Sequence, residues 1–324
     1  MPNSLEYGPR DLLGYGEKTP DPKWPGDAKI AISFVLNYEE GSEVCPENGD
    51  NVTEVLATEL GPGVQPCTGG VRDVNVESLY EYGSRAGVWR ILRLFKQYDC
   101  KVTAFAVGQA LLKNPEVGKA LVRDGHEIAS HGWRWVDRSE WTIEEEKENV
   151  KRCVEAIQKT SGNPPRGWYY GMIHSKAAER SRSVLATTFK ELGLPLLWYG
   201  DSYSDDLPYW VPYPGGEADE GLLIIPYTMD TNDYKNAGYQ AYITGGQFFE
   251  YLKDSFDELY AEGENGSPKM LSIGLHSRLV GRPGRIAGLR KFVEYIKKKD
   301  GVWVATREEI ANHWREQFPY KASL

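Results

Sequence analysis

Short apolar runs alternate with longer amphipathic segments along most of the 324 residues. This alternation is typical of βα units arranged around a parallel sheet. The short runs are apolar almost without interruption, as expected of strands that are covered on both faces. Eight such runs with helices between them favour a barrel over an open doubly wound sheet, so we expect an α/β fold built as a distorted (β/α) barrel of about seven to eight parallel strands. The predicted strands are 29–38, 101–107, 127–131, 167–170, 194–199, 222–227, 270–276 and 302–305.

Helices are expected in the segments between these strands. An apolar repeat at helical spacing predicts a helix over about 84–98. Thr142 followed by Glu145, and Thr306 followed by Glu309, match the capping box in which a Thr and a Glu three residues later satisfy the first N–H groups of a helix. We therefore expect one helix to begin after Thr142 and another after Thr306.

The chain reads as a single domain over 1–324, with an N-terminal arm over 1–28. No repeat, low-complexity tract or linker divides it. Two long loops, 41–77 and 201–220, interrupt the βα rhythm, and connections of this length inside a compact domain are usually functional or mobile. Because both follow a strand, we expect both to lie over the face of the barrel that carries active sites.

Overall charge and terminal sequence limit the classes of partner and location. The net charge of −9 argues against nucleic acid or an anionic membrane as a partner. No apolar run approaches the roughly 20 residues that span a bilayer, and the N-terminal segment lacks the basic start and apolar stretch of a secretory signal. We expect a cytoplasmic protein whose cysteines are free thiols, with export without a signal as the alternative; Cys45 and Cys67 could bridge in an oxidising compartment. The sequence leaves open whether the protein forms a homo-oligomer.

Acidic, basic and imidazole side chains gather where the predicted strands end. Glu39 and Glu40 follow the first strand and His131 ends the third. His276 ends the seventh strand and Arg278 comes two residues later. Aspartates follow the fifth and sixth strands, at positions 201, 230 and 233. A barrel brings these strand ends into one ring, where acid–base chemistry can occur.

Several segments in this order resemble the polysaccharide deacetylases of the NodB-homology, carbohydrate esterase type. Within that family the chain is most similar to the branch that contains metal-independent allantoinases and fungal chitin-oligomer deacetylases. The resemblance extends over nearly the whole chain and rests on FVLNYEEG, ESLYEYGSRAGVWRIL, GHEIASHGWRW, DSYSDDLPYW, IPYTMDTNDY, FFEYLKDSFDELYAEG and PKMLSIGLHSRLVGRP.

The resemblance implies a role for the first acidic pair and for His131. Glu39 matches the general base and Glu40 a metal ligand, although an isolated pair of glutamates is more often two solvated loop acids. His131 matches the first of two zinc-binding histidines, but the second position holds Trp135, which cannot bind a metal. Catalytic zinc normally has three protein ligands and a water. A zinc site would therefore need a third ligand, for which Asp230, or Asp137, is a guess.

His276 matches the family's general acid, which protonates the leaving amine. A histidine that closes a buried strand is equally often a packed core residue. Arg278 could hold a carboxylate, stabilise an oxyanion or pair with a loop aspartate.

Further residues are candidates for binding the substrate. Rings at the barrel mouth could form the wall of a cleft or could plug the barrel structurally; these are Trp135, Trp168, Tyr170 and Trp210. Loop aspartates could hold sugar hydroxyls or ureido groups, or could cap turns; these are Asp205, Asp206, Asp230 and Asp233.

The activity expected from these residues is hydrolysis of an amide, a carbon–nitrogen bond other than a peptide bond, by an activated water. The substrate is a small carbohydrate or a ureide. We favour N-deacetylation of chitin oligosaccharides, because Met172 follows Gly171 where allantoinase-like relatives carry an arginine. Opening of the cyclic amide of allantoin to allantoate is the alternative. A catalytically inactive carbohydrate-binding barrel is a third hypothesis, favoured by Trp135 and opposed by the retained Glu39 and His276.

Overall fold

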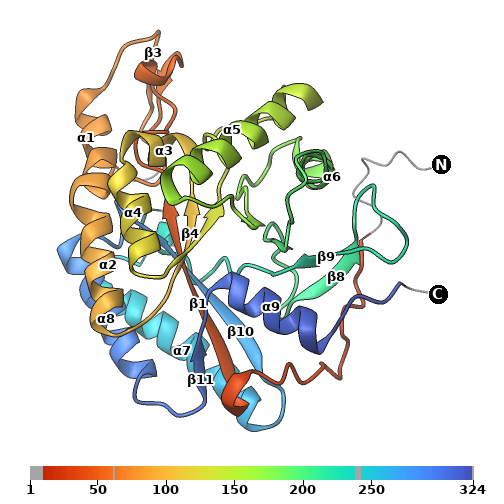
Figure 1. Cartoon of the computed structure of the whole chain (residues 1–324). Helices are drawn as coiled ribbons and strands as arrows, with labels where there is room; N and C mark the ends of the chain where they lie inside the picture. Colours follow the sequence, from red (N-terminus) through yellow and green to blue (C-terminus); the bar gives the residue numbers. More distant parts are fainter. Residues whose placement is uncertain (1–9, 61–62, 238–241, 323–324) are drawn as a thin grey trace.

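The structure, a computed structural model, describes residues 10–60, 63–237 and 242–322. All eight predicted strands are present as β1 (Ile30–Tyr38), β4 (Thr103–Ala106), β5 (Glu127–Ser130), β6 (Gly167–Trp168), β7 (Trp198–Tyr199), β9 (Gly221–Ile224), β10 (Lys269–His276) and β11 (Val302–Val304). Parallel pairing gives the order β10-β1-β4-β5-β6-β7-β9, and β11 pairs with β1. β1 and β10 run side by side through the centre of the curled sheet (Figure 1). A parallel bridge from Asn232 to Gly274 joins the segment after β9 to β10. The predicted α/β architecture with a distorted barrel is confirmed.

Helices cover the outside of the sheet (Figure 1). The capping boxes predicted at Thr142 and Thr306 are both present, at the starts of α5 and α9. The predicted helix over about 84–98 is the last part of a longer continuous run in which a π-helical turn joins α1 to α2. The helices are α1 (Val74–Tyr82), the π-turn η3 (Gly83–Gly87), α2 (Val88–Gln97), α3 (Gly108–Lys113), α4 (Pro115–Arg123), α5 (Ile143–Ser161), α6 (Ala178–Glu191), α7 (Gly245–Glu264), α8 (Pro283–Ile296) and α9 (Arg307–Gln317).

Both predicted long loops contain short regular elements. In the first, β2 (Val52–Thr53) and β3 (Cys67–Thr68) form an antiparallel pair, and α1 already begins at Val74. In the second, β8 (Tyr209–Pro212) pairs antiparallel with β9. Strands of two to four residues that are half-exposed carry too little periodicity to be found in a sequence.

Alternation along the strands divides the core into two layers. In β1, Ile32 and Phe34 face the outer helices, whereas Ala31 and Val35 face the interior of the barrel. Successive side chains of a strand point to opposite faces. Continuing this alternation, Glu39 is expected on the interior side and Glu40 on the helical side.

Trp24, in the described part of the N-terminal arm, packs at the end of the barrel opposite to these glutamates. The indole N–H of Trp24 donates to the carbonyl of Lys269, the first residue of β10, at 3.1 Å. Its ring lies against Trp303 and Trp314. Trp24 therefore covers the end of the barrel at which the strands begin.

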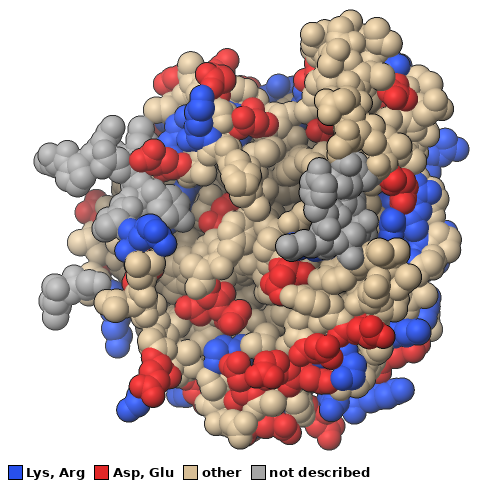
Figure 2. Space-filling view, turned by 180° about the vertical axis from the view of Figure 1, so that it is seen from behind, with Lys and Arg blue, Asp and Glu red and all other residues tan. Residues whose placement is uncertain are grey.

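Surface charge, helix hydropathy and the cysteines add three findings. Figure 2 shows acidic side chains gathered along the lower edge of one face, as the net charge of −9 leads one to expect. Within the part of the chain that the structure describes, no helix combines the length and apolar character needed to cross a membrane. The four cysteines carry free thiols, as expected by default.

Candidate active site

Four side chains from the ends of three strands meet at the mouth of the barrel. Glu39 follows β1, His131 follows β5, and His276 and Arg278 lie at the end of β10. Glu39 Oε1 lies 3.1 Å from His131 Nε2 and 3.8 Å from His276 Nε2, and Glu39 Oε2 lies 2.8 Å from Arg278 Nη1. Each of the four residues is less than a tenth exposed. The structure thus brings together the predicted base, the predicted acid and their neighbours, and we call these four residues the reaction ring.

The reaction ring holds Glu39 as a carboxylate. Burial alone would raise the pKa of Glu39, but the positive charge of Arg278, the imidazole of His276 and the hydrogen bond from His131 outweigh it. The pKa of Glu39 therefore lies well below its usual range. Opposite charges and donors close to a carboxylate favour its ionised form.

His131 is fixed by acceptors on both sides of its ring. Its Nδ1 lies 2.8 Å from the carbonyl oxygen of Tyr169, and its Nε2 faces Glu39. A carbonyl oxygen and a carboxylate both accept hydrogen bonds, so each is a partner for a ring N–H of His131. The ring also stacks on Tyr169, with centroids 5.4 Å apart. His131 thus places a ring nitrogen beside Glu39 in the interior of the reaction ring.

Asp233 positions His276. Its Oδ1 lies 2.7 Å from His276 Nδ1, and its Oδ2 accepts the backbone N–H groups of His276 and Val280. Burial lowers the pKa of His276, but Asp233 and Glu39 outweigh it and raise that pKa above its ordinary value. Asp233 is fully buried and both of its oxygens are engaged. The predicted substrate-binding role for Asp233 is therefore wrong, because its carboxylate orients His276.

Glu40 points away from the reaction ring toward η3, as the alternation along β1 requires. Its side chain accepts the backbone N–H groups of Glu39 and Arg278, both at 3.2 Å. Burial raises its pKa to about 7, while Arg278 opposes this and Glu39 adds to it. A Cβ placed on Gly83 would lie 2.2 Å from Glu40 Oε1, so only glycine lets the π-turn pass this carboxyl.

The donor set does not fit the family's zinc site. Glu40 and His131 contact different partners, and Arg278 Nη1 lies 2.8 Å from Glu39 and 3.6 Å from Glu40, so that a guanidinium supplies positive charge between the two carboxyls. Asp230 is exposed and its carboxylate accepts from Tyr251. Residues 10–60, 63–237 and 242–322 contain no cluster of three or more His, Cys, Asp or Glu side chains that could hold an ion. Asp230 is therefore no third ligand.

Asp137, the other guess for a third metal ligand, forms a turn. Its Oδ1 accepts from the backbone and hydroxyl of Ser139 and from the hydroxyl of Ser175. These contacts belong to the role of aspartate in capping turns.

Arg278 links the reaction ring to the loop over 41–77. Its Nε donates to the carbonyl of Ala57 at 2.9 Å, and its guanidinium carbon lies 4.8 Å from the centre of the Tyr80 ring. The Tyr80 hydroxyl in turn donates to the carbonyl of Leu56. One buried arginine therefore fixes both the carboxylate of Glu39 and the loop above it.

Two of the four predicted aromatic side chains lie elsewhere. Trp168 is fully buried and packs edge-on against Phe189 of α6, because residue 168 faces the helices and residue 169 faces the barrel interior. Trp210 lies on β8, where its indole N–H donates to the carbonyl of Phe318. For Trp168 and Trp210 the substrate-binding prediction is wrong.

The other two aromatic side chains lie beside the reaction ring. The Trp135 ring centre is 6.4 Å from that of His131, and its indole N–H donates to the carbonyl of Tyr170. Tyr170 lines a cavity next to the reaction ring. A role for either residue in binding the substrate stays a prediction.

Asp205 and Asp206 also lie away from the reaction ring. The Asp205 carboxylate accepts the backbone N–H of Leu207. The carbonyl of Asp206 accepts from Met270, near the start of β10, whereas His276 ends that strand. Six residues of extended chain separate the two positions by roughly 20 Å. The substrate-binding prediction for these aspartates is therefore wrong, because the chain between β7 and β8 fills the side of the barrel.

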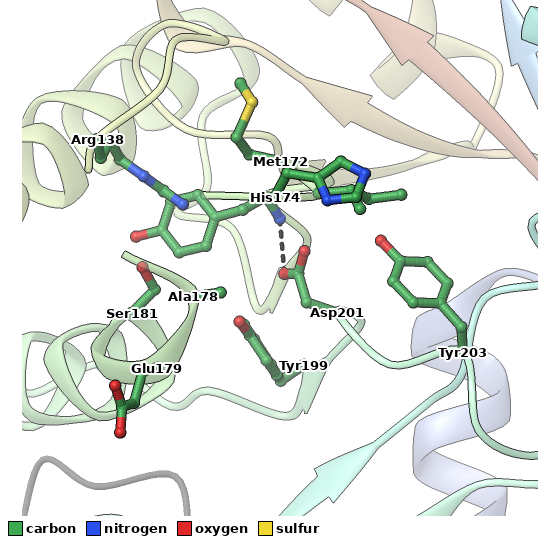
Figure 3. Close-up of a pocket in the computed structure, with 11 residues that line it drawn as sticks. Arg138, Met172, His174, Ala178, Glu179, Ser181, Tyr199, Asp201 and Tyr203 are labelled. Atoms are coloured by element: carbon green, nitrogen blue, oxygen red, sulfur yellow. Dashed lines mark hydrogen bonds between the residues drawn. The ribbon is translucent and has the colours of Figure 1, made fainter. Parts of the chain in front are cut away.

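Asp201 is one of the aspartates that follow the predicted strands, but the sequence did not assign it a role. It follows β7 and accepts the backbone N–H groups of Tyr170 and Gly171, both at 2.7 Å. Burial raises its pKa. With Tyr170 and Tyr203 it lines a cavity of about 430 Å³ (Figure 3). Its place directly after a strand is the same signal that identified His131.

The chain is similar to known proteins over nearly its whole length. The family model described as polysaccharide deacetylase matches residues 70–187. A putative polysaccharide deacetylase of Schizosaccharomyces pombe is 46% identical over 98% of this chain and its own full length. Two solved structures, a probable polysaccharide deacetylase from Pseudomonas aeruginosa PAO1 and a protein titled Puue allantoinase, are each 48% identical and each have a TM-score of 0.89. They cover 97% of this chain and 100% and 99% of their own chains, respectively. The chain therefore belongs to the polysaccharide deacetylase family.

Proposed function

We propose that this protein hydrolyses the cyclic amide of a small ureide of the allantoin type. The observation that carries this proposal is the reaction ring itself, in which one carboxylate lies between two imidazoles and a guanidinium without a zinc donor set. The 48% identity to the protein titled Puue allantoinase supports the same substrate class. This differs from the chitin oligosaccharide that we favour from the sequence.

The chemistry follows from the contacts of Glu39. In hydrolysis, Glu39 takes a proton from water while the oxygen attacks the amide carbon, and His276 donates a proton to the leaving nitrogen. His131 and Arg278 now donate to the two Glu39 oxygens. As negative charge develops on the substrate oxygen, that oxygen accepts a hydrogen bond from one of these donors. Glu39 then loses this donor, so it becomes a stronger base.

Access to the reaction ring favours a small substrate. His131 is 3% exposed and His276 is 7% exposed. A long sugar chain needs an open groove, whereas a small ring can enter a confined site and lose most of its water there. The second candidate is N-deacetylation of a chitin oligosaccharide, which the family's description favours.

Product analysis separates these functions. Purified protein would be incubated with allantoin and, separately, with chitin oligosaccharides, each with and without a chelator, and the products followed by mass spectrometry. We expect allantoin to gain one water, with or without chelator. Loss of acetyl groups from the oligosaccharide with no change in allantoin would instead establish the deacetylase. If neither substrate is turned over, and the oligosaccharide binds to Glu39→Gln protein as tightly as to the unmodified protein, a carbohydrate-binding barrel would be favoured.

A further inference from the structure

The chain directly after β6, residues 169–171, lies against the imidazole of His131, and we call it the histidine loop. The carbonyl oxygen of Tyr169 lies 2.8 Å from His131 Nδ1, and the Tyr169 ring stacks on the imidazole at an interplanar angle of 10°. A Cβ placed on Gly171 would lie 3.1 Å from His131 Cε1. One short segment therefore borders this histidine with a carbonyl oxygen, an aromatic ring and a glycine.

Two side chains hold the backbone of the histidine loop. The indole N–H of Trp135 donates to the carbonyl of Tyr170 at 3.2 Å. Asp201 accepts the N–H of Tyr170 with Oδ2 and that of Gly171 with Oδ1, both at 2.7 Å (the dashed line in Figure 3 marks the first of these bonds). Hydrogen bonds to an ionised acceptor are stronger than those between neutral groups. One carboxylate thus holds two successive N–H groups of the loop, one with each oxygen.

Gly171 meets two requirements that exclude a side chain. Its φ of +66° lies in the left-handed region, which glycine adopts without a steric cost. A Cβ at this position would also lie 2.6 Å from Tyr169 Cε1, in addition to its contact with the imidazole of His131. Any larger residue would have to displace the Tyr169 ring, the imidazole or the loop itself. The close approach of the loop to both rings therefore depends on glycine.

The histidine loop connects Asp201 to the reaction ring. Asp201 follows β7, and β6 lies between β7 and β5, the strand that His131 follows. The hydrogen bonds of Asp201 therefore reach His131 through the backbone of residues 169–171. On its other side, His131 Nε2 lies 3.1 Å from Glu39 Oε1. The groups that hold the loop thus determine the position of a ring nitrogen that contacts the proposed base.

We propose that Asp201 and Gly171 are positioning residues for the reaction, because through the histidine loop they fix where the imidazole of His131 meets Glu39. The proposal rests on the proposed function in that hydrolysis takes place at the reaction ring, but it holds for a ureide and for an oligosaccharide alike. It gives Asp201 a role that requires no contact with the substrate. A misplacement of about 1 Å in a catalytic group can lower a rate by roughly 100-fold, so small movements of the loop are expected to affect turnover.

The first test compares Gly171→Ala with Gly193→Ala. Both glycines have a φ of +66°, but a Cβ on Gly193, which follows α6, meets nothing within 4 Å. The two variants therefore share the backbone strain and differ in the contact with His131. We expect kcat for allantoin to fall by roughly 10- to 100-fold in Gly171→Ala, with a smaller change in KM, and to stay unchanged in Gly193→Ala. Equal rates in the two variants would overturn the role of Gly171.

The second test substitutes the carboxylate. Asp201→Asn keeps the size of the side chain, but its amide nitrogen cannot accept, so one N–H of the histidine loop loses its acceptor. We expect kcat to fall by roughly 10-fold or more at a temperature where the variant is folded. Asp205→Asn is the matched control, because Asp205 also accepts a backbone N–H, that of Leu207, and lies away from the reaction ring. A folded Asp201→Asn protein with an unchanged kcat would overturn the proposal.

The third test observes His131 without any turnover. The chain has five histidines, so NMR of protein labelled at histidine gives few imidazole signals, and loss of one signal in His131→Gln assigns that of His131. We expect this signal to move in Asp201→Asn and Gly171→Ala and to stay in Asp205→Asn and Gly193→Ala. A residue that only stabilises the fold would lower the melting temperature and leave the signal in place, and this result would overturn the proposal. If the unmodified protein turns over neither allantoin nor chitin oligosaccharides, the proposed function fails, whereas the His131 signal still decides whether Asp201 positions this histidine.

Discussion

The Nδ1 atom of His276 lies 2.7 Å from Oδ1 of Asp233, and the other oxygen of this carboxylate accepts the backbone N–H of the same histidine. Asp233 therefore fixes both the ring and the main chain of His276, and it holds the proton on Nδ1. The free Nε2 faces Glu39 at 3.8 Å. This geometry leaves one nitrogen of His276 to exchange a proton with the substrate.

Substituting Asp233 by asparagine should lower the pKa of His276. Asp233 and Glu39 raise that pKa, whereas burial and Arg278 lower it. If protonated His276 is the general acid, activity is lost as pH rises through its pKa. The alkaline limb of the pH profile should therefore move to lower pH in Asp233→Asn, and kcat should fall by about 10-fold or more. Rates at several pH values check this, and an unmoved alkaline limb would remove His276 from the role of acid.

Glu39→Gln should lower turnover by roughly 100-fold or more, because an amide cannot take the proton from water. The variant also leaves Arg278 without its carboxylate at 2.8 Å, so a lower melting temperature is expected. Steady-state rates and thermal unfolding are measured together, with Glu47→Gln as a control, since Glu47 is 55% exposed in the neighbouring loop. A Glu39→Gln protein that is folded and fully active would contradict the assignment of the base.

The strands and the positions of the reaction ring could both be predicted from the apolar runs of the sequence. Continuous apolar runs mark strands, and the residues directly after them, such as Glu39, His131 and His276, meet at one end of a barrel. The sequence could not show which face each side chain takes. Trp168 and Tyr169 are neighbours, yet one packs against Phe189 and the other stacks on His131, because alternation sends them to opposite faces.

Contacts between residues far apart in the sequence could not be predicted either. Asp233 lies 43 residues before His276, and nothing in either segment indicates their pairing. The chain after β7 was expected at the barrel mouth, but it follows the side of the barrel, so Asp205 and Asp206 lie away from the reaction ring.

The π-turn η3 predicts a strict requirement for glycine. A Cβ on Gly83 would lie 2.2 Å from Glu40 Oε1. Gly83→Ala should therefore displace Glu40 and destabilise the fold by about 1–3 kcal/mol, as other overpacked sites do. Gly284→Ala is the matched control, because a Cβ at this glycine of α8 meets nothing within 4 Å. Urea unfolding of both variants checks the difference, and equal stability would show that η3 can move without cost.

The buried carboxyls around Arg278 predict that stability declines at alkaline pH. Burial raises the pKa of Glu54 to about 8, opposed by Arg278 and assisted by Glu39 and Glu43, and it raises that of Glu40 to about 7. The folded state then binds more protons than the unfolded state, whose glutamates titrate near about pH 4.3. This contribution is fully present below that pH and is lost as pH rises through about 7 to 8.

Glu54→Gln removes one ionisable group and keeps an acceptor for the Tyr80 hydroxyl, which lies 3.4 Å from Glu54 Oε1. The fall in melting temperature between about pH 6 and about pH 9 should be smaller in this variant than in the unmodified protein. Thermal unfolding across that range measures it, with Glu47→Gln again as the exposed control. The lowered pKa of Glu39 acts in the opposite direction, because its contribution to the stability of the fold is lost only in acid. Glu39 therefore cannot produce the decline at alkaline pH. An identical decline in Glu54→Gln and unmodified protein would show that Glu54 is ionised in the folded state at neutral pH.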